Sequence, residues 1–456
     1  SIVGDDQNQD ADVFLRDLNT DSTSLISAHA PSLPARTGPG FFSLAENSIS
    51  ADGRFLILSA VGSRLVKDAT GILPHVVVRD LAAGTNLPVD MLENPEGLAV
   101  SSWNLPFPTN LVARLPVISA NGRSAAYLGQ SPTNGPLLDQ VYVRDLLSAT
   151  NWLASRAWNS TNPGTARCYQ PSLSGDGTRV AFQSDANNLV PTDTNGKSDI
   201  FARDLGAVSN LLVSVNRFGT NSANNFSTNP VISRDGRWVA FQSRATDLVT
   251  NTFASQFFQL FVRDLLANST TLISQDTNGV GLNRDCSRPI FNPGSRFVLF
   301  QQTNQVFLWD LFAQTNSLVC SNCTAPALSA DGRWIAVETR LGTNQVKDIV
   351  LLDLQTGATN LVSANLGHTG GGNGSSLKPV ISYDGRYVVF VSRASDLVDH
   401  DANGRSDVFI WDRVLNATLL ASRNFAGPGS GNSVSSAPIL GADGRSVAFQ
   451  SFAADL

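Results

Sequence analysis

The stretch Pro230-Val231-Ile232-Ser233-Arg234-Asp235-Gly236-Arg237-Trp238-Val239-Ala240-Phe241 decides the fold, because variants of it recur along the whole chain. Its central turn is found again at seven places: Asp52-Gly53-Arg54, Asn121-Gly122-Arg123, Asp176-Gly177-Thr178, the degraded Gly294-Ser295-Arg296, Asp331-Gly332-Arg333, Asp384-Gly385-Arg386 and Asp443-Gly444-Arg445. Successive turns are 53 to 69 residues apart, except for one interval of 37. Self-similarity at such a spacing indicates a repeat architecture.

A second unit, Asp-Val-Phe-x-Arg-Asp-Leu, alternates with the first. Its last Asp falls at Asp17, Asp80, Asp145, Asp204, Asp264, Asp310, Asp353 and Asp412. Both units predict β-strands, and Asp-Gly between two apolar runs predicts a tight hairpin with a type I′ turn. A short strand such as 271–274 follows each second unit, which gives four strands per repeat. Four-stranded sheets repeated radially are the blades of a β-propeller, so we expect an all-β, eight-bladed propeller.

The two ends of the chain complete each other. The chain ends with the first half of a repeat and begins with the second half. We therefore expect one propeller domain over residues 1–456, closed by pairing of its N- and C-terminal strands, with one blade shared by residues 1–28 and 435–456. An insertion at about 90–115 is the best candidate for a cap over one face. Because the chain begins at Ser1 without an apolar leader, we expect a processed product or a piece of a longer protein.

The composition excludes several functional classes. The net charge is −6, with 32 Lys and Arg against 38 Asp and Glu, so the chain lacks the dense positive field that nucleic acid requires. No apolar run reaches about 18 residues, so no membrane-spanning helix is expected. Hydrophobic residues make up 42% of the chain and charged residues 15%, which allows a large core.

The Pro-x-Ile-Ser-x-Asp-Gly-Arg-x-Val-Ala-Phe unit resembles the repeat of the TolB-like propeller family, a relative of the WD40 repeat. The resemblance covers nearly the whole chain and implies the propeller fold. The family includes periplasmic protein-binding propellers, the propellers of prolyl-oligopeptidase-type peptidases and some glycan-active enzymes. Eight repeats distinguish this chain from TolB itself.

The most specific local motif predicts a calcium loop. Residues 399–407 match Asp-x-Asp-x-Asn-Gly-x-x-Asp, in which oxygens at alternate positions converge on a hard cation and Gly permits the sharp turn. The expected ligands are side-chain oxygens of Asp399, Asp401, Asn403 and Asp407 and the carbonyl of Arg405. Weaker copies are Asp193, Asn195 and Asp199, and Asp6, Asn8 and Asp12. A structural calcium ion is the expected cofactor, and an ordinary Asx-turn without an ion is the alternative.

Three of the four cysteines occupy equivalent places in the repeat. Cys168, Cys286 and Cys323 each precede an inner strand by three residues, where other repeats have Ser. Cys320 and Cys323 also form Cys-Ser-Asn-Cys, which by itself is a weak zinc motif. A disulfide among Cys286, Cys320 and Cys323 and buried free thiols both remain open.

Nucleophilic catalysis finds little support, since the sequence contains no Gly-x-Ser-x-Gly elbow. The loops before the inner strands carry aromatic, Arg and His residues that could stack on sugars or hold a peptide. This candidate ligand-binding face comprises Trp158, Phe218, Phe425, Arg114, Arg167, Arg284 and His368. Packing against a neighbouring blade is the alternative role for the aromatic residues.

The sequence thus favours a binding or scaffold propeller that recognises a protein or glycan partner on one face. It would be extracellular, periplasmic or at the cell surface, and could be a module of a larger surface protein. The alternative is a propeller enzyme, either a polysaccharide lyase or hydrolase or a peptidase-like enzyme, with its site at the channel mouth. Asp285, Glu46 and His368 would then be candidate participants, and two carboxylates about 5–10 Å apart would support hydrolysis.

Overall fold

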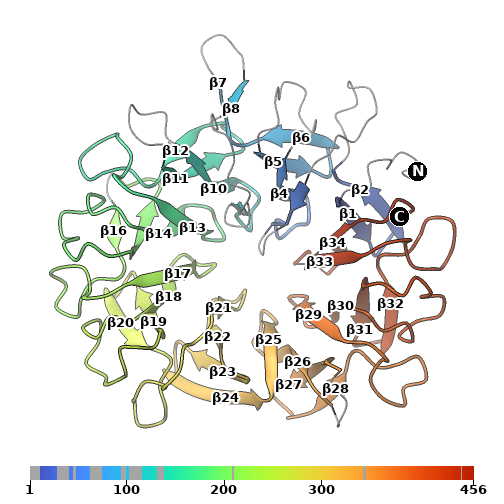
Figure 1. Cartoon of the computed structure of the whole chain (residues 1–456). Helices are drawn as coiled ribbons and strands as arrows, with labels where there is room; N and C mark the ends of the chain where they lie inside the picture. Colours follow the sequence, from blue (N-terminus) through green and yellow to red (C-terminus); the bar gives the residue numbers. More distant parts are fainter. Residues whose placement is uncertain are drawn as a thin grey trace. The chain divides into compact units, whose positions relative to one another are not determined.

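The computed structural model describes residues 11–27, 41–44, 48–61, 74–93, 99–101, 116–130, 138–207, 210–341, 346–442 and 444–456. In these ranges the chain forms eight four-stranded antiparallel sheets, which we call blades 1 to 8, and one two-stranded sheet (Figure 1). The fold class is the all-β, eight-bladed β-propeller that the repeat predicts. No helix in the described ranges is long and apolar enough to cross a membrane.

The chain separates into two compact units of four blades each. Blades 2 to 5 belong to the unit that contains Val100–Ser321. Their strands are β9 (Val117–Ile118), β10 (Ser124–Gln130), β11 (Asp139–Asp145) and β12 (Asn151–Leu153); β13 (Cys168–Leu173), β14 (Arg179–Ser184), β15 (Asp199–Asp204) and β16 (Leu211–Leu212); β17 (Ser227–Ile232), β18 (Trp238–Ser243), β19 (Gln259–Asp264) and β20 (Ser269–Leu272); β21 (Ile290–Phe291), β22 (Phe297–Gln302), β23 (Gln305–Asp310) and β24 (Thr315–Ser321).

The other unit contains Ser1–Pro88 and Asn322–Leu456 and holds blades 6, 7, 8 and 1. Their strands are β25 (Cys323–Leu328), β26 (Trp334–Thr339), β27 (Asp348–Asp353) and β28 (Thr359–Leu361); β29 (Ser376–Ile381), β30 (Tyr387–Ser392), β31 (Asp407–Asp412) and β32 (Ala417–Leu420); β33 (Ser435–Leu440), β34 (Ser446–Ser451), β1 (Asp12–Asp17) and β2 (Ser22–Leu25); β3 (Phe41–Ser43), β4 (Phe55–Val61), β5 (Pro74–Asp80) and β6 (Thr85–Pro88).

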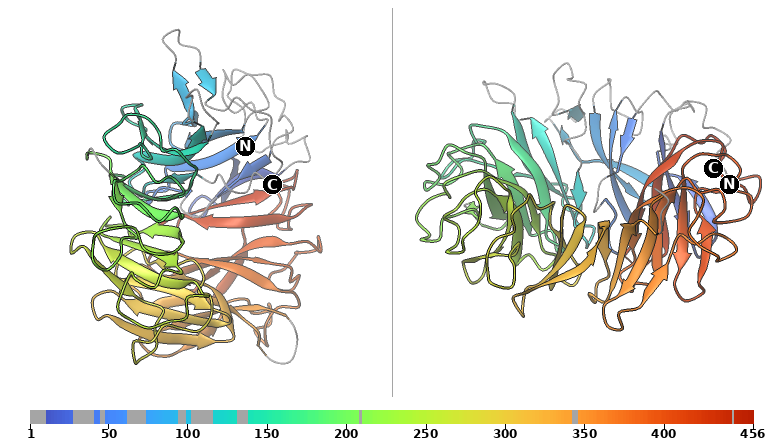
Figure 2. Two further views of the ribbon diagram at one scale, coloured as in Figure 1. Left: turned by 60° about the vertical axis from the view of Figure 1, so that its left-hand side comes forward. Right: turned by 60° about the horizontal axis from the view of Figure 1, so that its bottom comes forward.

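Blade 8 joins the two ends of the chain in one sheet. Strand β1 pairs with β34 over six residues, with Asp12 opposite Ser451 and Asp17 opposite Ser446. In both views of Figure 2 a blue strand from the start of the chain accordingly lies beside the red strands from its end. The aromatic rings of Phe14 and Phe449 face each other in this register at 5.9 Å between centroids. Pairing of the terminal strands leaves neither β1 nor β34 as an open edge, as the split repeat predicts.

The core lies between successive blades of each unit. In six blades the second and third strands carry a facing aromatic pair, for example Phe241 and Phe261, whose ring centroids are 5.8 Å apart. Both rings are fully buried and pack in one cluster with Val239, Ile232 and Leu248. Such clusters bury the two faces of each sheet, which is the main stabilising term of the fold.

The Asp-Gly turns differ from the type I′ turn that the sequence suggests. Gly236 has φ 71°, whereas Asp235 has no positive φ, so the two positive values that a type I′ turn requires are not present. The Asp235 carboxylate instead accepts the N–H of Arg237 at 3.0 Å and closes the turn through its side chain. In blade 5, Ser295 takes the place of the glycine with φ 56°.

An Arg–Asp ion pair connects the two hairpin turns of a blade. Arg237 Nη2 lies 2.7 Å from Asp264 Oδ2, and Asp264 Oδ1 accepts the N–H groups of Leu266 and Ala267. We call this end of the blades the hairpin edge. The same ion pair occurs in five further blades: Arg54–Asp80, Arg123–Asp145, Arg296–Asp310, Arg333–Asp353 and Arg386–Asp412. In blade 3, where Thr178 has the place of the arginine, the next residue, Arg179, pairs with Asp204 at 3.4 Å.

Two irregular repeats have simple structural reasons. The repeat with the 37-residue interval is short because β22 and β23 are joined by Thr303 and Asn304 alone. The insertion predicted at about 90–115 contains a two-stranded sheet of β7 (Met91–Glu93) and β8 (Ala99–Ser101). Residues 94–98 and 102–115 of the insertion lie outside the described ranges.

Candidate functional site

The longer connections lie at the other end of the blades, which we call the loop edge. They are the loops between the second and third strands and the connections from the fourth strand to the next blade. Asp247 links a loop of the first kind to a connection of the second kind. Its carbonyl accepts the Arg217 N–H at 2.8 Å, and its Oδ1 accepts the Asn224 N–H at 2.9 Å. Equivalent main-chain bonds run from Trp158 to Asn188, from Leu366 to Asp396 and from Phe425 to Asp455.

These bonds present one apolar side chain in each connection. Trp158 is 48% exposed, Leu366 53% and Phe425 59%. In the blade 3–4 connection the donor is Arg217, and the exposed ring belongs to the next residue, Phe218, at 68%. The Arg217 guanidinium lies 4.7 Å from the centroid of the Phe218 ring. These side chains are therefore available for contact with a ligand and do not pack into a neighbouring blade.

The remaining described residues of the candidate face lie in these connections and in the blade 4–5 connection. Arg167 and Arg284 are exposed and lie in the blade 2–3 and blade 4–5 connections. Asp285 beside Arg284 accepts the Phe258 N–H at 2.6 Å. His368 is exposed, with φ 51°, in the same connection as Leu366. Arg114 and Glu46 lie outside the described residues.

The loop of blade 3 carries two buried carboxylates. Asp199 is fully buried, and Asp193 keeps 5% exposure. Asp199 Oδ1 accepts the hydroxyl of Ser214, and Asp199 Oδ2 accepts Asn195 Nδ2 at 2.7 Å. The same Nδ2 donates to the carbonyl oxygen of Ala223 at 2.6 Å. Two oxygen acceptors from different connections thus converge on one amide nitrogen.

The loop of blade 7 repeats this arrangement in the other unit. Asp407 is fully buried and Asp401 keeps 7% exposure. Asp407 Oδ1 accepts the Ser422 hydroxyl at 2.7 Å, and Asp407 Oδ2 accepts Asn403 Nδ2 at 2.7 Å. Asn403 Nδ2 also donates to the Gly431 carbonyl at 2.7 Å.

Burial dominates the electrostatics of both loops. It raises the pKa of Asp199 to about 7 and the pKa of Asp407 to about 6, and the neighbouring Asp193 and Asp401 raise them further. Burial also raises the pKa of Asp193 and of Asp401. One oxygen of each of these two residues, Oδ1, is buried without a hydrogen-bond donor.

The other predicted ligands have different surroundings. Asp399 is exposed, and its counterpart in the blade 3 loop is Pro191. The Arg405 N–H donates to Asn403 Oδ1 at 2.6 Å, which forms the Asx-turn that the sequence offers as the alternative. In the third predicted loop Asp12 is buried and accepts the Ser27 hydroxyl, whereas Asp6 and Asn8 lie outside the described residues.

Blades 2 and 4 have glutamine at the position of Asp199 and Asp407. Gln259 accepts the Ser274 hydroxyl at 2.8 Å, as the aspartates accept theirs, but its Nε2 donates directly to the Leu282 carbonyl at 2.6 Å. Gln140 in blade 2 accepts Ser155 and donates to the Ala166 carbonyl at 2.9 Å. A neutral glutamine amide therefore provides both the acceptor for the serine hydroxyl and the donor for the carbonyl oxygen, without another side chain of the loop.

The cysteines occupy the equivalent positions that the repeat predicts. Cys168 pairs with Ser184 and Cys323 with Thr339 at the first residues of β13 and β25, and Cys286 pairs with Gln302 in an isolated bridge before β21. Cys168 and Cys286 are buried free thiols, and burial raises the pKa of Cys168 to about 11. Cys320 and Cys323 are disulfide-bonded.

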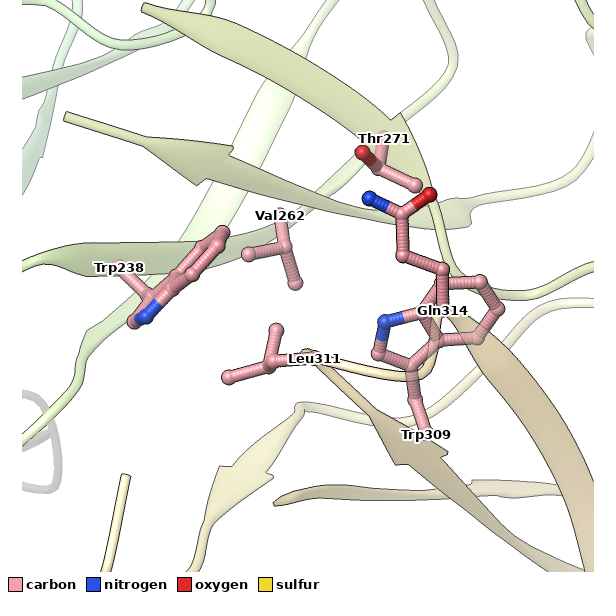
Figure 3. Close-up of a pocket in the computed structure, with 6 residues that line it drawn as sticks. All are labelled: Trp238, Val262, Thr271, Trp309, Leu311 and Gln314. Atoms are coloured by element: carbon pink, nitrogen blue, oxygen red, sulfur yellow. The ribbon is translucent and has the colours of Figure 1, made fainter. Parts of the chain in front are cut away.

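A small pocket between blades 4 and 5 is unsuited to chemistry. Its walls are Trp238, Val262, Trp309 and Leu311, with Thr271 and Gln314 as the polar members (Figure 3). None of these side chains can act as an acid, base or nucleophile near neutral pH. The pocket is therefore part of the interface between the two blades.

Sequence reasoning missed one charged cluster in blades 6 and 7. Glu338 is buried, and its Oε2 lies 2.7 Å from Lys347 Nζ. Its Oε1 accepts the N–H of Lys378, which has φ 53° in a β-bulge of β29. The sequence feature that could have identified this cluster is the scarcity of its residue types, since the chain has only four Glu and four Lys.

Comparison with known proteins gives a partial relationship. No protein-family model matches the chain. The probable dipeptidyl-peptidase 5 of Aspergillus terreus is 30% identical over 108 residues, which are 23% of this chain and 15% of that protein. The dipeptidyl-peptidase 5 of Aspergillus fumigatus is 28% identical over 103 residues, which are 22% of this chain and 14% of that protein. The match thus spans a small part of each relative.

Solved structures support the fold. Dipeptidyl peptidase 4 of Porphyromonas gingivalis superposes with a TM-score of 0.55 and 12% identity, covering 90% of this chain and 55% of that one. The match with TolB of Acinetobacter baumannii includes 92% of this chain and 86% of that one, at 15% identity. Its TM-score is only 0.34, so no conclusion is based on it.

These comparisons correct the main functional expectation. A binding or scaffold propeller for a protein or glycan partner is wrong as the leading interpretation, because the curated proteins that match in sequence are peptidases. The enzyme alternative is favoured instead, in its peptidase-like form.

Proposed function

We propose that this chain acts in peptide hydrolysis, as a propeller of the dipeptidyl-peptidase type. The observation that carries the proposal is the 30% identity over 108 residues to a probable dipeptidyl-peptidase 5. We also propose, from the motif itself, that the repeat belongs to the TolB-like propeller family.

The loop edge supports a role in contacting the peptide. Phe218 and Trp158 are exposed there, and aromatic faces bind both apolar side chains and peptide groups. The sequence has no Gly-x-Ser-x-Gly elbow, and in the described ranges no group of three His, Cys, Asp or Glu side chains gathers. In this proposal the described residues therefore bind and orient the peptide, and the attacking group belongs to another part of the protein.

The test is to incubate the complete gene product with short unmodified peptides and to identify the products by mass spectrometry. The expected result is stepwise loss of N-terminal dipeptides, with no cleavage of the same peptides after N-acetylation. Peptides that stay intact would overturn the proposal, as would cleavage of polysaccharides instead of peptides.

An extracellular or periplasmic location is part of the proposal. The Cys320–Cys323 disulfide supports it, because disulfides persist in oxidising compartments. Fractionation of the producing cells tests it, and recovery of the protein from the cytoplasm with both thiols reduced would contradict it.

A further inference from the structure

The acidic loops of blades 3 and 7 contain buried oxygens that the protein does not satisfy. Asp193 Oδ1 and Asp401 Oδ1 have no donor, although the two residues are only 5% and 7% exposed. A buried carboxylate without a partner is costly, so a positively charged group is expected beside it. The same orphaned atom occurs in both loops, one in each compact unit.

The glutamine blades indicate that these carboxylates are not required by the fold. Gln259 makes the serine contact that Asp407 makes and satisfies its neighbouring carbonyl with its own amide. A propeller blade is therefore complete with a neutral residue at this position. Blade 6 makes the same serine contact through the buried Asp348. Blades 3 and 7 add to this contact a second buried acid and an Asn-Gly turn, and thus negative charge that the contact itself does not use.

The oxygens of each loop are suited to one hard cation. Asp407 Oδ2 and the Gly431 carbonyl both lie 2.7 Å from Asn403 Nδ2, so they converge on one point. Asp199 Oδ2 and the Ala223 carbonyl converge in the same way on Asn195 Nδ2. Carboxylate and carbonyl oxygens without nitrogen or sulfur are the ligands that Ca²⁺ prefers, and irregular loops suit its flexible coordination better than the octahedral demand of Mg²⁺.

We infer that each of these two loops binds a Ca²⁺ ion, through Asp193 and Asp199 in blade 3 and through Asp401 and Asp407 in blade 7. Carbonyl oxygens of the adjoining connection, at Ala223 and Gly431, complete the oxygen set. The exposed Asp399 contributes little, because Pro191 has its place in the other loop. The Asn403 amide nitrogen lies 2.7 Å from both Asp407 Oδ2 and the Gly431 carbonyl oxygen.

Calcium would strengthen the link between two segments that already share hydrogen bonds. The blade 3 loop contacts the connection that bears Phe218, since the Ser222 N–H donates to the Thr192 carbonyl at 2.9 Å. Bound Ca²⁺ thus holds the connection that presents Phe218 to the loop edge. The inference does not depend on the peptidase proposal, because metal binding is measured without a substrate.

The experiment uses the full chain after treatment with a chelator. Isothermal titration with CaCl₂ should give heat of binding, and the melting temperature in CaCl₂ should exceed that in EDTA by about 2–4 °C. Asp193→Asn and Asp401→Asn should each remove one ion and part of the thermal shift. Asp185→Asn is the matched control, because Asp185 is exposed in the same blade as Asp193 and should leave both signals unchanged.

Several outcomes would overturn the inference. Absence of heat and of a thermal shift with wild-type chain would show that the Asx-turn needs no ion, and an equal response to MgCl₂ would reject calcium. In EDTA, Asp193→Asn and Asp401→Asn should melt at or above the wild-type temperature, because asparagine removes a buried charge. If the two variants melt at a lower temperature than wild type in EDTA, the carboxylates stabilise the fold by themselves.

Discussion

The two ends of the blades differ in how much they vary along the chain. At the hairpin edge, Arg237 and Asp264 repeat in nearly the same form in five other blades. At the loop edge, the first residue of the third strand differs between blades. It is an aspartate in some, such as Asp407, and a glutamine in others, such as Gln259, and both accept a serine hydroxyl. Constant contacts belong to the architecture, whereas the varying ones mark the places where blades acquire separate tasks.

The loop edge also separates two solutions to the same packing problem. A serine hydroxyl from the following connection caps the first residue of the third strand in both kinds of blade. Gln259 then supplies its own donor, whereas Asp407 depends on Asn403 and leaves Asp401 with an unused oxygen. The difference shows that the acidic version carries more charge than folding requires.

Breaking the hairpin edge should have the largest effect. Asp264→Ala removes a carboxylate that is only 4% exposed and leaves the N–H groups of Leu266 and Ala267 and the Arg237 guanidinium without this acceptor. We expect the free energy of unfolding to fall by about 2–3 kcal/mol, measured by urea denaturation. Asp185→Asn is the control, because it changes an exposed carboxylate and keeps an oxygen that can accept the Tyr169 hydroxyl, so it should cost less than about 0.5 kcal/mol. Equal losses in the two variants would remove the distinction between the edges.

Converting a glutamine blade to an acidic one should cost somewhat less. Gln259→Asp buries a carboxylate and deprives the Leu282 carbonyl of its donor, so we expect a loss of about 2 kcal/mol at neutral pH. Burial raises the pKa of such a group, so its cost is present above the raised pKa and disappears on acidification. Urea denaturation of the variant and of wild type at about pH 7 and at about pH 4 measures the loss of stability and its disappearance on acidification. Calcium should not rescue this variant, because its loop lacks a second acid; rescue would show that one carboxylate is enough.

Acidification should weaken the hairpin edge by a smaller amount per blade. The Arg54 hydrogen bonds lower the pKa of Asp80 below its ordinary value of 3.8, and those of Arg333 lower the pKa of Asp353. A lowered carboxyl pKa contributes stability that is present above the unfolded value and is lost as the pH falls through the folded value. The melting temperature should therefore decrease when the pH is lowered from about 4 downwards. Asp80→Asn should show a shallower fall than wild type, and parallel curves would contradict this assignment.

Much of the fold could be predicted because it rests on local chemistry that repeats. The unit around Asp235 and the aspartate at Asp264 identify the strands of every blade, and the split repeat predicts that β1 and β34 share one sheet. The turn type was wrong because the Asp235 side chain, which no hairpin rule counts, closes the turn. The Glu338–Lys347 pair was missed because its members are brought together by register and not by spacing in a motif.

The candidate site was less predictable for the same reason. The spacing of Asp401 and Asp407 identifies an oxygen-rich loop, but the burial that separates them from the exposed Asp399 depends on the connection carrying Gly431. That contact joins residues almost thirty positions apart and is invisible in the nine-residue motif. Likewise, sequence alone left the aromatic residues between packing and exposure, which tertiary structure decides.

The smallest expected effect concerns the exposed side chains of the loop edge. Phe218→Ala removes a ring that is 68% exposed, so it should leave the free energy of unfolding nearly unchanged. If the ring contacts a peptide, its loss should lower kcat/KM of the complete gene product about fivefold, which corresponds to about 1 kcal/mol for one aromatic contact. Leu266→Ala is the matched control, because Leu266 is 77% exposed but lies at the hairpin edge. An equal decrease for both variants, or no decrease for Phe218→Ala, would place the peptide contacts elsewhere than the loop edge.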